Sequence, residues 1–262
     1  MTPHLSRIVL YPLKSLDGQE VSEAVLLRNA GLRHDREYCL LDEAGGVLNT
    51  KRLGELLLRI RSEVHFGFGE ITLRDGSGEE TFSLDRERTR LEEWFSGYLG
   101  QKVTLAHDPE RGFQDDPDAS GPTLISTATL EEVASWFGLD VGEARRRFRP
   151  NLEIDGVPAF WEDQLYGPPG ETVRFRIGEV AFEGIKPCAR CTVPSRDSQS
   201  GEVREAQFAR ILAKKRQATL PAWADKSRFD HFYRLSVNTR VPETEAGKEL
   251  QVSDELDLAK DH

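Results

Sequence analysis

The sequence predicts a fold of the α+β class that is mainly β. An N-terminal β-barrel-like domain is expected to pack on a second β-barrel core with flanking helices. Many short runs of alternating apolar residues, separated by Gly-rich turns, favour this class. Fewer segments have helical spacing; in the clearest, Leu91, Trp94, Phe95 and Tyr98 follow one another at i, i+3, i+4 and i+7.

The N-terminal half is expected to consist of short strands around that single helix. Asp42 to Gly46 has the composition of a hairpin turn between two of the strands. The strands are expected over residues 6–13, 19–27, 33–41, 47–52, 60–68, 70–74, 80–84 and 103–106.

A polar stretch rich in Gly, Pro and Asp over residues 111–121 is the best internal boundary. We therefore expect one domain over residues 1–110 and a second over residues 111–262. In the second, Ser126 or Thr127 can cap a helix whose apolar stripe ends at Phe137. The run Arg145-Arg146-Arg147 lies in a short helix or turn and is interpreted as a solvated basic face rather than part of a pocket.

The remaining elements of the second half follow from similar patterns. Arg-Pro at 149–150 is taken as the entry to a strand over residues 148–154. Residues 172–182 form two alternating runs joined at Ile177 to Glu179, which predicts a hairpin. Residues 204–216 are expected to be helical, with closing strands over residues 235–239 and 249–252.

Composition limits the partners and the compartment. The 262 residues include 35 Lys and Arg against 45 Asp and Glu, a net charge of −10, so general nucleic-acid binding is not expected. No apolar run is long enough to span a membrane, and the N-terminus lacks the pattern of a signal peptide. We expect a cytoplasmic protein in a reducing compartment.

The hairpin leads into a Cys-x-x-Cys, Cys188 and Cys191, expected in a Pro-bounded loop. Three interpretations stay open. A zinc site needs two more ligands, and neither Cys39 nor any pair of histidines has ligand spacing. A dithiol redox pair would favour a helix start, which the following residues do not resemble. In the third, one thiolate binds a soft metal and Arg190 helps to keep a thiol ionised.

Four separated segments place cations at expected strand ends or turns. Each alone is most simply a solvated charge; together they could surround an anion, because Arg offers phosphate a planar fork and Lys a point charge. The segments are Lys14-Ser15, Asp35-Arg36, Thr50-Lys51-Arg52 and Arg149-Pro150-Asn151.

At these motifs the sequence resembles the MOSC-domain family. Cys-Ala-Arg-Cys followed by Asp197 and Gly201 resembles its core motif, and Tyr-Pro-Leu-Lys-Ser and Phe-Arg-Pro-Asn occur in the family's order. The closest branch contains the mitochondrial amidoxime-reducing component and its bacterial relatives. The resemblance implies a MOSC N-terminal barrel, a MOSC core and the molybdenum-molybdopterin cofactor, with tungsten in place of molybdenum left open.

The resemblance also implies roles for single residues. Cys191 would be the thiolate on the metal, Cys188 a neighbour, and Asp197 a proton donor or orienting group. Trp161-Glu162-Asp163 would shape the substrate entrance, unless it only packs. The cofactor would be held by Lys14, Ser15, Arg36, Lys51, Arg52, Ser120, Gly121, Ser126, Arg149, Asn151 and Cys191.

The implied activity is reduction of N-hydroxylated or N-oxide compounds. With no cysteines left for a ferredoxin-type cluster, electrons would come from a separate donor protein, of the ferredoxin or cytochrome b5 type with its reductase. Two alternatives stay open: a cofactor carrier or sulfur-transfer module without reductase activity, and a metal-free dithiol protein.

Overall fold

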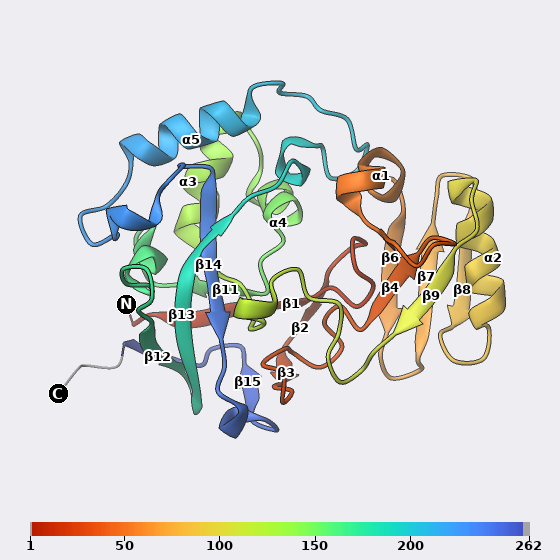
Figure 1. The fold of residues 1–262 in the computed structure, drawn as a ribbon, viewed down its shortest axis with the longest axis horizontal. Helices are drawn as coiled ribbons and strands as arrows, with labels where there is room; N and C mark the ends of the chain where they lie inside the picture. Colours follow the sequence, from red (N-terminus) through yellow and green to blue (C-terminus); the bar gives the residue numbers. More distant parts are fainter. Residues whose placement is uncertain (1, 259–262) are drawn as a thin grey trace.

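An eight-stranded sheet crosses the larger half of the molecule and joins strands from both ends of the chain (Figure 1). The computed structural model describes residues 2–258. The strand order is β16-β12-β13-β14-β10-β11-β1-β2, and only β10 and β11 run parallel. The strands are β1 His4–Leu10, β2 Gln19–Val21, β10 Leu124–Ser126, β11 Leu152–Asp155, β12 Val173–Ile177, β13 Val180–Ala189, β14 Arg234–Arg240 and β16 Leu256–Leu258.

Strand β1 ties the beginning of the chain to the second half. It runs antiparallel to β11, with Leu5 opposite Ile154 and Ile8 opposite Leu152. These side chains are buried in one apolar core with Phe175 and Phe182 of the β12–β13 hairpin. The sheet therefore crosses the expected domain boundary, and the division at residue 110 stays a prediction.

Three small sheets complete the β structure. Two of them pack with helix α2 around a second core that includes Leu40, Phe82 and Phe95. No closed barrel is present among residues 2–258, although the α+β class is confirmed. Their strands are β3 Glu23–Val25, β4 Tyr38–Leu41, β5 Val47–Leu48, β6 Arg61–His65, β7 Glu70–Arg74, β8 Glu79–Ser83, β9 Thr104–His107 and β15 Glu249–Gln251.

Helices α3, α4 and α5 lie together above the large sheet, and α1 lies between the two halves (Figure 1). A third core joins α3, α4 and α5 through residues such as Leu130, Phe148 and Phe208. No helix in the described chain is long and apolar enough to cross a bilayer. The helices are α1 Thr50–Leu57, α2 Arg88–Leu99, α3 Thr127–Phe137, α4 Val141–Phe148 and α5 Phe208–Ala218. Short 3₁₀ turns occur at η1 Pro117–Ala119, η2 Trp161–Gln164, η3 Val193–Ser195, η4 Lys226–Arg228 and η5 Glu243–Glu245.

Several expected elements are confirmed. Helix α2 covers the Leu91 to Tyr98 pattern, and the hairpin is β12 and β13, with Phe175 paired to Phe182. Ser126 caps α3 by accepting a hydrogen bond from the Thr129 N–H at 3.1 Å. A side-chain acceptor at this position satisfies one of the unpaired donors of the first helical turn.

Two expected strands in the N-terminal half are wrong in part. Residues 33–37 form a turn, with positive φ at His34 and Arg36, and β4 begins only at Tyr38. Helix α1 starts at Thr50 because Asn49 accepts hydrogen bonds from the two N–H groups of Lys51 and Arg52. The return strand therefore stops at Leu48 instead of continuing to residue 52.

Three further bounds also differ. The expected strand over residues 19–27 is split at Ser22 into β2 and β3. The segment taken as strand 148–154 begins as the end of α4: Arg149 adopts a left-handed conformation, and β11 starts at Leu152. Helix α5 begins at Phe208, four residues after the expected start.

The segment after β13 crosses to the N-terminal half and packs on α1 (Figure 1). Arg59 Nε donates to the Ser200 carbonyl at 3.1 Å, and Arg61 Nη2 donates to the Ser198 carbonyl at 3.1 Å. A Cβ on Gly201 would lie 2.5 Å from Glu55 Cα, so this glycine permits the close approach. The two halves thus enclose a shared space between them.

Candidate functional site

A cavity of about 560 Å³ brings together most of the residues singled out from the sequence. Eight of the expected cofactor-binding residues line it, and Cys188 does too. They come from the β1–β2 connection, the 33–37 turn, α1, the segment before β10, the end of α4 and the end of β13. The eight are Lys14, Ser15, Arg36, Lys51, Gly121, Arg149, Asn151 and Cys191.

The other three expected binding residues form hydrogen bonds to groups outside the cavity. Arg52 Nη1 binds the Asp42 carboxylate at 2.9 Å. Ser120 Oγ donates to the Asn29 carbonyl at 2.6 Å, and Ser126 is the helix cap described above. None of the three is among the residues that line the cavity.

Asp197 also lies off the cavity wall. Its Oδ1 accepts hydrogen bonds from the N–H groups of Gln199 and Ser200, at 3.1 and 2.9 Å, and Arg204 lies 3.1 Å from Oδ2. Burial alone would raise the pKa of Asp197, but the hydrogen bonds from Ser200 and Gln199 bring it below its ordinary value. The carboxylate therefore fixes the turn after η3 and is poorly suited to donate a proton.

Three of the cavity residues have an uncommon backbone conformation. Ser15, Arg36 and Arg149 have φ values of 79°, 54° and 51°, a region that non-glycine residues rarely adopt. Such strain gathers where the surrounding structure fixes a functional side chain. Here it turns three separate segments so that their side chains reach one cavity.

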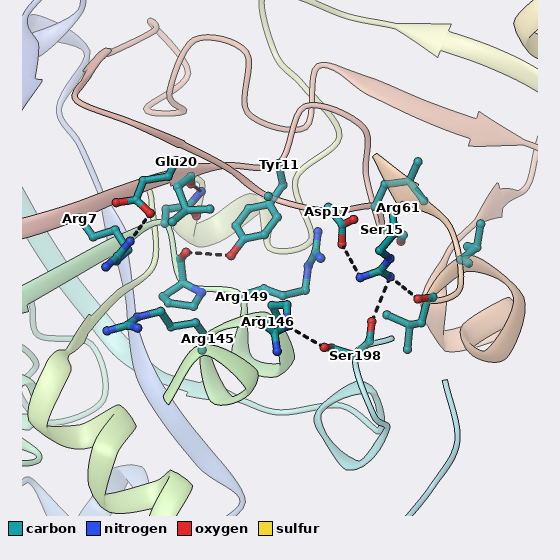
Figure 2. A pocket seen from close by; sticks show the side chains of 18 of the residues that line it. Arg7, Tyr11, Ser15, Asp17, Glu20, Arg61, Arg145, Arg146, Arg149 and Ser198 are labelled. Carbon is teal, nitrogen blue, oxygen red and sulfur yellow. Dashed lines mark hydrogen bonds and ion pairs between the residues drawn. The ribbon is translucent and has the colours of Figure 1, made fainter. Parts of the chain in front are cut away.

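Tyr11 lies between two of these cations. The guanidinium carbon of Arg149 is 4.1 Å from the centre of the Tyr11 ring (Figure 2). The guanidinium carbon of Arg36 is 5.2 Å from the same ring centre. Burial raises the pKa of Tyr11 to about 12, so the phenol stays neutral and donates to the Pro150 carbonyl at 3.1 Å. The ring thus holds both guanidinium groups through cation–π contacts.

Burial and partners act differently on the two arginines. Burial would lower the pKa of Arg36, but Asp35, bonded directly to it, raises that pKa above its ordinary value. Burial lowers the pKa of Arg149, and the nearby Arg36 charge acts in the same direction. Arg149 remains cationic, because no protein environment deprotonates a guanidinium. Asp17 and Asp35 act on its charge from nearby, but among the described residues neither forms an ion pair with it.

Asn151 and Lys14 complete this end of the cavity. Asn151 Oδ1 accepts from Arg36 Nη1 at 3.3 Å, while its Nδ2 donates to the Val9 carbonyl at 3.0 Å. Lys14 Nζ donates to the Phe113 carbonyl at 2.6 Å and pairs with Asp115 at 2.8 Å. Lys14 thereby ties the 108–121 segment over the cavity.

The cavity wall is strongly cationic in an acidic protein. Eight Lys or Arg side chains line it against two carboxylates, those of Asp115 and Asp116. Among residues 2–258, Lys51, Arg149 and Arg190 have no ion-pair partner. The eight cations are Lys14, Arg36, Lys51, Arg147, Arg149, Lys186, Arg190 and Arg234.

Three of these cations, Arg147, Lys186 and Arg234, were not expected in the pocket from sequence, and Arg190 was expected only beside the thiols. The assignment of the whole 145–147 run to a solvated face is wrong for Arg147, whose side chain is only 3% exposed and pairs with Glu143 at 2.6 Å. A signal was present, because Ala144, Arg147 and Phe148 share one helical face. Lys186 and Arg234 reach the cavity through the pairing of β13 with β14, which the sequence does not reveal.

The two cysteines differ in position. Cys188 lies within β13 rather than in the loop, and Arg190 Nη1 donates to its sulfur at 3.2 Å. Cys191 follows the strand end, and its carbonyl accepts a bond from the Tyr233 hydroxyl at 2.9 Å. Within the described part of the chain, no side chain hydrogen-bonds to the Cys191 sulfur. This thiol is therefore available as a ligand at the cationic wall.

Gly121 marks the closest approach between the 108–121 segment and β14. Its N–H donates to the Thr239 carbonyl at 3.0 Å, and a Cβ would lie 2.8 Å from that oxygen. Trp161, Glu162 and Asp163, expected at the entrance, line neither cavity, and both carboxyl groups are buried. The alternative of plain packing holds for this segment.

The donor set fits one kind of ligand. Across the described residues, no three His, Cys, Asp or Glu side chains come together as a metal site. A single free thiol next to an anion-binding wall instead suits a metal whose other ligands belong to an anionic cofactor. A multidentate protein-only metal site would need ligands that this cavity does not offer.

Comparisons with known proteins agree with this chemistry. The sequence model described as "MOSC N-terminal beta barrel domain" matches residues 2–93, and the one described as "MOSC domain" matches residues 118–256. A molybdenum cofactor sulfurase of Oryza sativa subsp. japonica is 26% identical, covering 97% of this chain and 35% of that protein. Molybdenum cofactor sulfurase 3 of Aedes aegypti is 39% identical over 76% of this chain and 30% of its own length.

The chain thus spans about a third of the length of these curated relatives. Among solved structures, the YUAD protein from Bacillus subtilis aligns over 98% of this chain and 94% of its own, with 11% identity and a TM-score of 0.42.

Proposed function

The chain belongs to the MOSC-domain family, and from that premise we propose that it is a molybdenum cofactor-dependent oxidoreductase. It reduces N-hydroxylated or N-oxide compounds, as amidoxime reductases do. The observation that carries the proposal is the convergence of eight cations and the free thiol of Cys191 on one cavity. The molybdenum-molybdopterin cofactor combines a soft metal with a phosphate dianion, and this wall complements both.

Each end of the cofactor has a proposed partner. Cys191 gives a thiolate to the metal. Lys14, Ser15 and Arg36, which line the same cavity, hold the phosphate: the two cations attract it and Ser15 adds a hydroxyl that can donate a hydrogen bond. Arg149 and Asn151 hold the pterin ring. Lys51, which has a solvated charge, adds to the attraction of the anion.

The cofactor, when bound, supplies the two-electron chemistry that removes the substrate oxygen. The net reaction takes up two electrons and two protons, converts N–OH to N–H and releases water. The chain's residues bind and orient the reactants, and the cationic wall stabilises anionic groups. Asp197 is not proposed as the proton donor, because its carboxylate is ionised and lies off the cavity wall. Water supplies the protons instead.

The electrons come from a separate protein in this proposal. A ferredoxin-type or cytochrome b5-type donor with its reductase is the partner class, and the substrate is a small molecule. Nucleic acid and membrane are not proposed as partners, and the compartment proposed is the cytoplasm.

The direct test is metal content and turnover in protein made by a cofactor-competent host. Elemental analysis is expected to find molybdenum, or tungsten, at about one atom per chain, and benzamidoxime is expected to be reduced with an artificial electron donor. Cys191→Ser should keep the pterin and lose the metal and the activity. The matched variant Cys188→Ser should keep the metal. Metal-loaded protein without turnover on any N-hydroxylated compound would refute the reductase.

A second function is supported by the names of the relatives. Both curated proteins described above are molybdenum cofactor sulfurases, so the chain could act as a cofactor carrier or sulfur-transfer module. Transfer of the cofactor, or of sulfur on it, to an apo-acceptor enzyme without amidoxime turnover would establish that function. A reversible Cys188–Cys191 disulfide in protein that never takes up metal, measured by thiol titration, would instead establish the dithiol alternative.

A further inference from the structure

A second cavity, of about 270 Å³, adjoins the larger one (Figure 2). The two share three lining residues, Ser15, Arg149 and Asn151. Most of the rest of its wall comes from β1, the 16–18 turn, the residues around the end of α1, and α4, with single residues from β2, β6, β11 and the segment after η3. It too lies where the two halves of the chain meet. The function proposed above leaves this cavity unused.

Its lining has an apolar part and a charged part. Val9, Leu16, Leu57, Leu58, Ile60 and Pro150 form the apolar part. The charged part holds five arginines against three carboxylates. A pocket of this composition favours a ligand with an apolar body and a small number of polar groups. The charges decide which polar group that is.

The three carboxylates are already neutralised. Glu153 receives two hydrogen bonds from Arg145, both at 2.6 Å, and Glu20 is bonded to Arg7. Asp17 lies 3.2 Å from Arg61. A cationic ligand would have to displace one of these arginines, so the acids do not recruit one.

Two cations are left without a full partner. Arg149 has no ion pair in the described part of the chain, and Figure 2 shows its guanidinium between Tyr11 and Asp17. Arg146 pairs with Glu143 at 3.0 Å, but that carboxylate also serves Arg147 at 2.6 Å. Asp17, the carboxylate beside Arg149, is paired with Arg61. A partly buried guanidinium that shares its nearest carboxylate with another cation is not fully compensated, and binding of an anion supplies the missing charge.

We propose that the smaller cavity is a second ligand site, which binds an organic anion: a ring compound that carries a phosphate or a carboxylate. The anionic group sits at Arg149 and Arg146, where a planar fork can bind either oxyanion through two hydrogen bonds. The ring lies against the apolar wall. This inference goes beyond the proposed reductase and does not require it.

The shared residues couple the two cavities. Because Arg149 and Ser15 line both, a ligand in the smaller cavity competes for the same guanidinium that faces the larger one. Occupation of one cavity therefore changes the affinity of the other. An anion bound in the smaller cavity could in this way regulate ligand binding in the larger one.

Calorimetric titration of the full chain with phenyl phosphate, benzoate and benzyl alcohol tests the proposal. We expect saturable binding of at least one of the two anions and none of the neutral alcohol; the tighter anion identifies the group as phosphate or carboxylate. Arg149→Gln should weaken binding about tenfold or more. Arg146→Gln, at an exposed side chain that lines only this cavity, should weaken it several-fold.

The matched control is Lys51→Gln, which removes an exposed cation that lines only the larger cavity. Its affinity for the anion should equal that of the unsubstituted chain. If Lys51→Gln weakened binding of the anion while Arg146→Gln left it unchanged, the anion would lie in the larger cavity and the proposal would be overturned. Failure of both anions to bind, or equal binding of benzyl alcohol, would also overturn it. Metal content is unaffected by either result, so the reductase is judged separately.

Discussion

Glu162 illustrates how a single buried carboxyl sets the pH dependence of this chain. It is fully buried in η2, where Thr129 donates a hydrogen bond to it at 3.0 Å. Burial, with a further contribution from the charge of Asp163, raises the pKa of Glu162 from 4.5 to about 7. The folded protein therefore holds this proton more tightly than the unfolded chain does.

The sign of the effect follows from the linkage of protonation and folding. Below the unfolded pKa the carboxyl is protonated in both states and costs no stability. As pH rises from 4.5 to about 7, the folded state becomes less stable by roughly 3 kcal/mol. Glu162→Gln should remove this loss, so the variant should exceed the unsubstituted protein in free energy of unfolding at pH 8 and match it near pH 4.5.

Urea unfolding at the two pH values measures the difference. Gln keeps an oxygen that can accept the Thr129 hydrogen bond, so packing changes little. If the variant lost the same stability at both pH values, burial of an ionised Glu162 would not be the cause. The sequence did not point to this behaviour, because Trp-Glu-Asp looks like a surface loop, and only the packing of η2 shows that the carboxyl groups are buried.

The cations of the larger cavity show both what sequence reveals about single residues and what it leaves hidden. Lys14, Arg36 and Arg149 were expected at the cofactor because their segments resemble the motifs of the MOSC family; the turns beside them alone left each one most simply a solvated charge. Lys186 and Arg234 could not be predicted, since they look like ordinary exposed strand residues until the register of β13 and β14 is known.

At the scale of elements, the end of α4 combines a structural role with a binding role. Helices often end with a glycine in the left-handed conformation, yet here Arg149 occupies that position at a φ of 51°. The sequence Arg-Pro suggested a strand entry, which is why the expected strand began too early. The cap is recognisable only when the helix before it is known.

Arg149→Gly should therefore separate stability from binding. Glycine relieves the left-handed strain, which costs about 1 kcal/mol for other residues, while the guanidinium is lost. We expect the cofactor-free variant to unfold at an equal or higher temperature and to retain far less cofactor. Ser253→Gly, at another positive φ of 84° outside both cavities, is the control: it should gain stability and keep the cofactor.

Gly121 sets the position of the 108–121 segment against β14. In Gly121→Ala the new methyl group would meet the Thr239 carbonyl oxygen at 2.8 Å, so the segment must shift. Overpacking of this kind costs about 1–3 kcal/mol. Thermal unfolding should show that loss, and cofactor retention should fall with it. Gly97→Ala, on α2 with no atom within 4 Å of the new group, should instead stabilise by about 0.5–1 kcal/mol.

At the scale of the whole molecule, the pairing of β1 with β11 joins parts of the chain that the sequence suggested were separate. The expected boundary at 111–121 was inferred from composition, which reports local flexibility and not strand pairing. Hairpins such as β12–β13 were predictable because their partners are adjacent in sequence. The large sheet was not, because its order depends on contacts between distant segments.

A fragment of residues 111–262 tests how independent the second half is. It lacks β1, so β11 would have an open edge, and Leu152 and Ile154 would lose their partners Ile8 and Leu5. We expect the fragment to be largely unfolded or aggregated by circular dichroism and size-exclusion chromatography. Adding a peptide of residues 2–27 should recover part of the native signal. A fragment that folds cooperatively alone would show that β1 is dispensable.

The same pairing has a consequence for biosynthesis. When the ribosome has made β1 and β2, the two can form a hairpin, but the other edge of β1 has no partner until Leu152 to Asp155 have been translated. Throughout that interval Leu5, Ile8 and Leu10, which end in the core, remain uncovered on the nascent chain. A strand in that condition is what ribosome-associated chaperones shield.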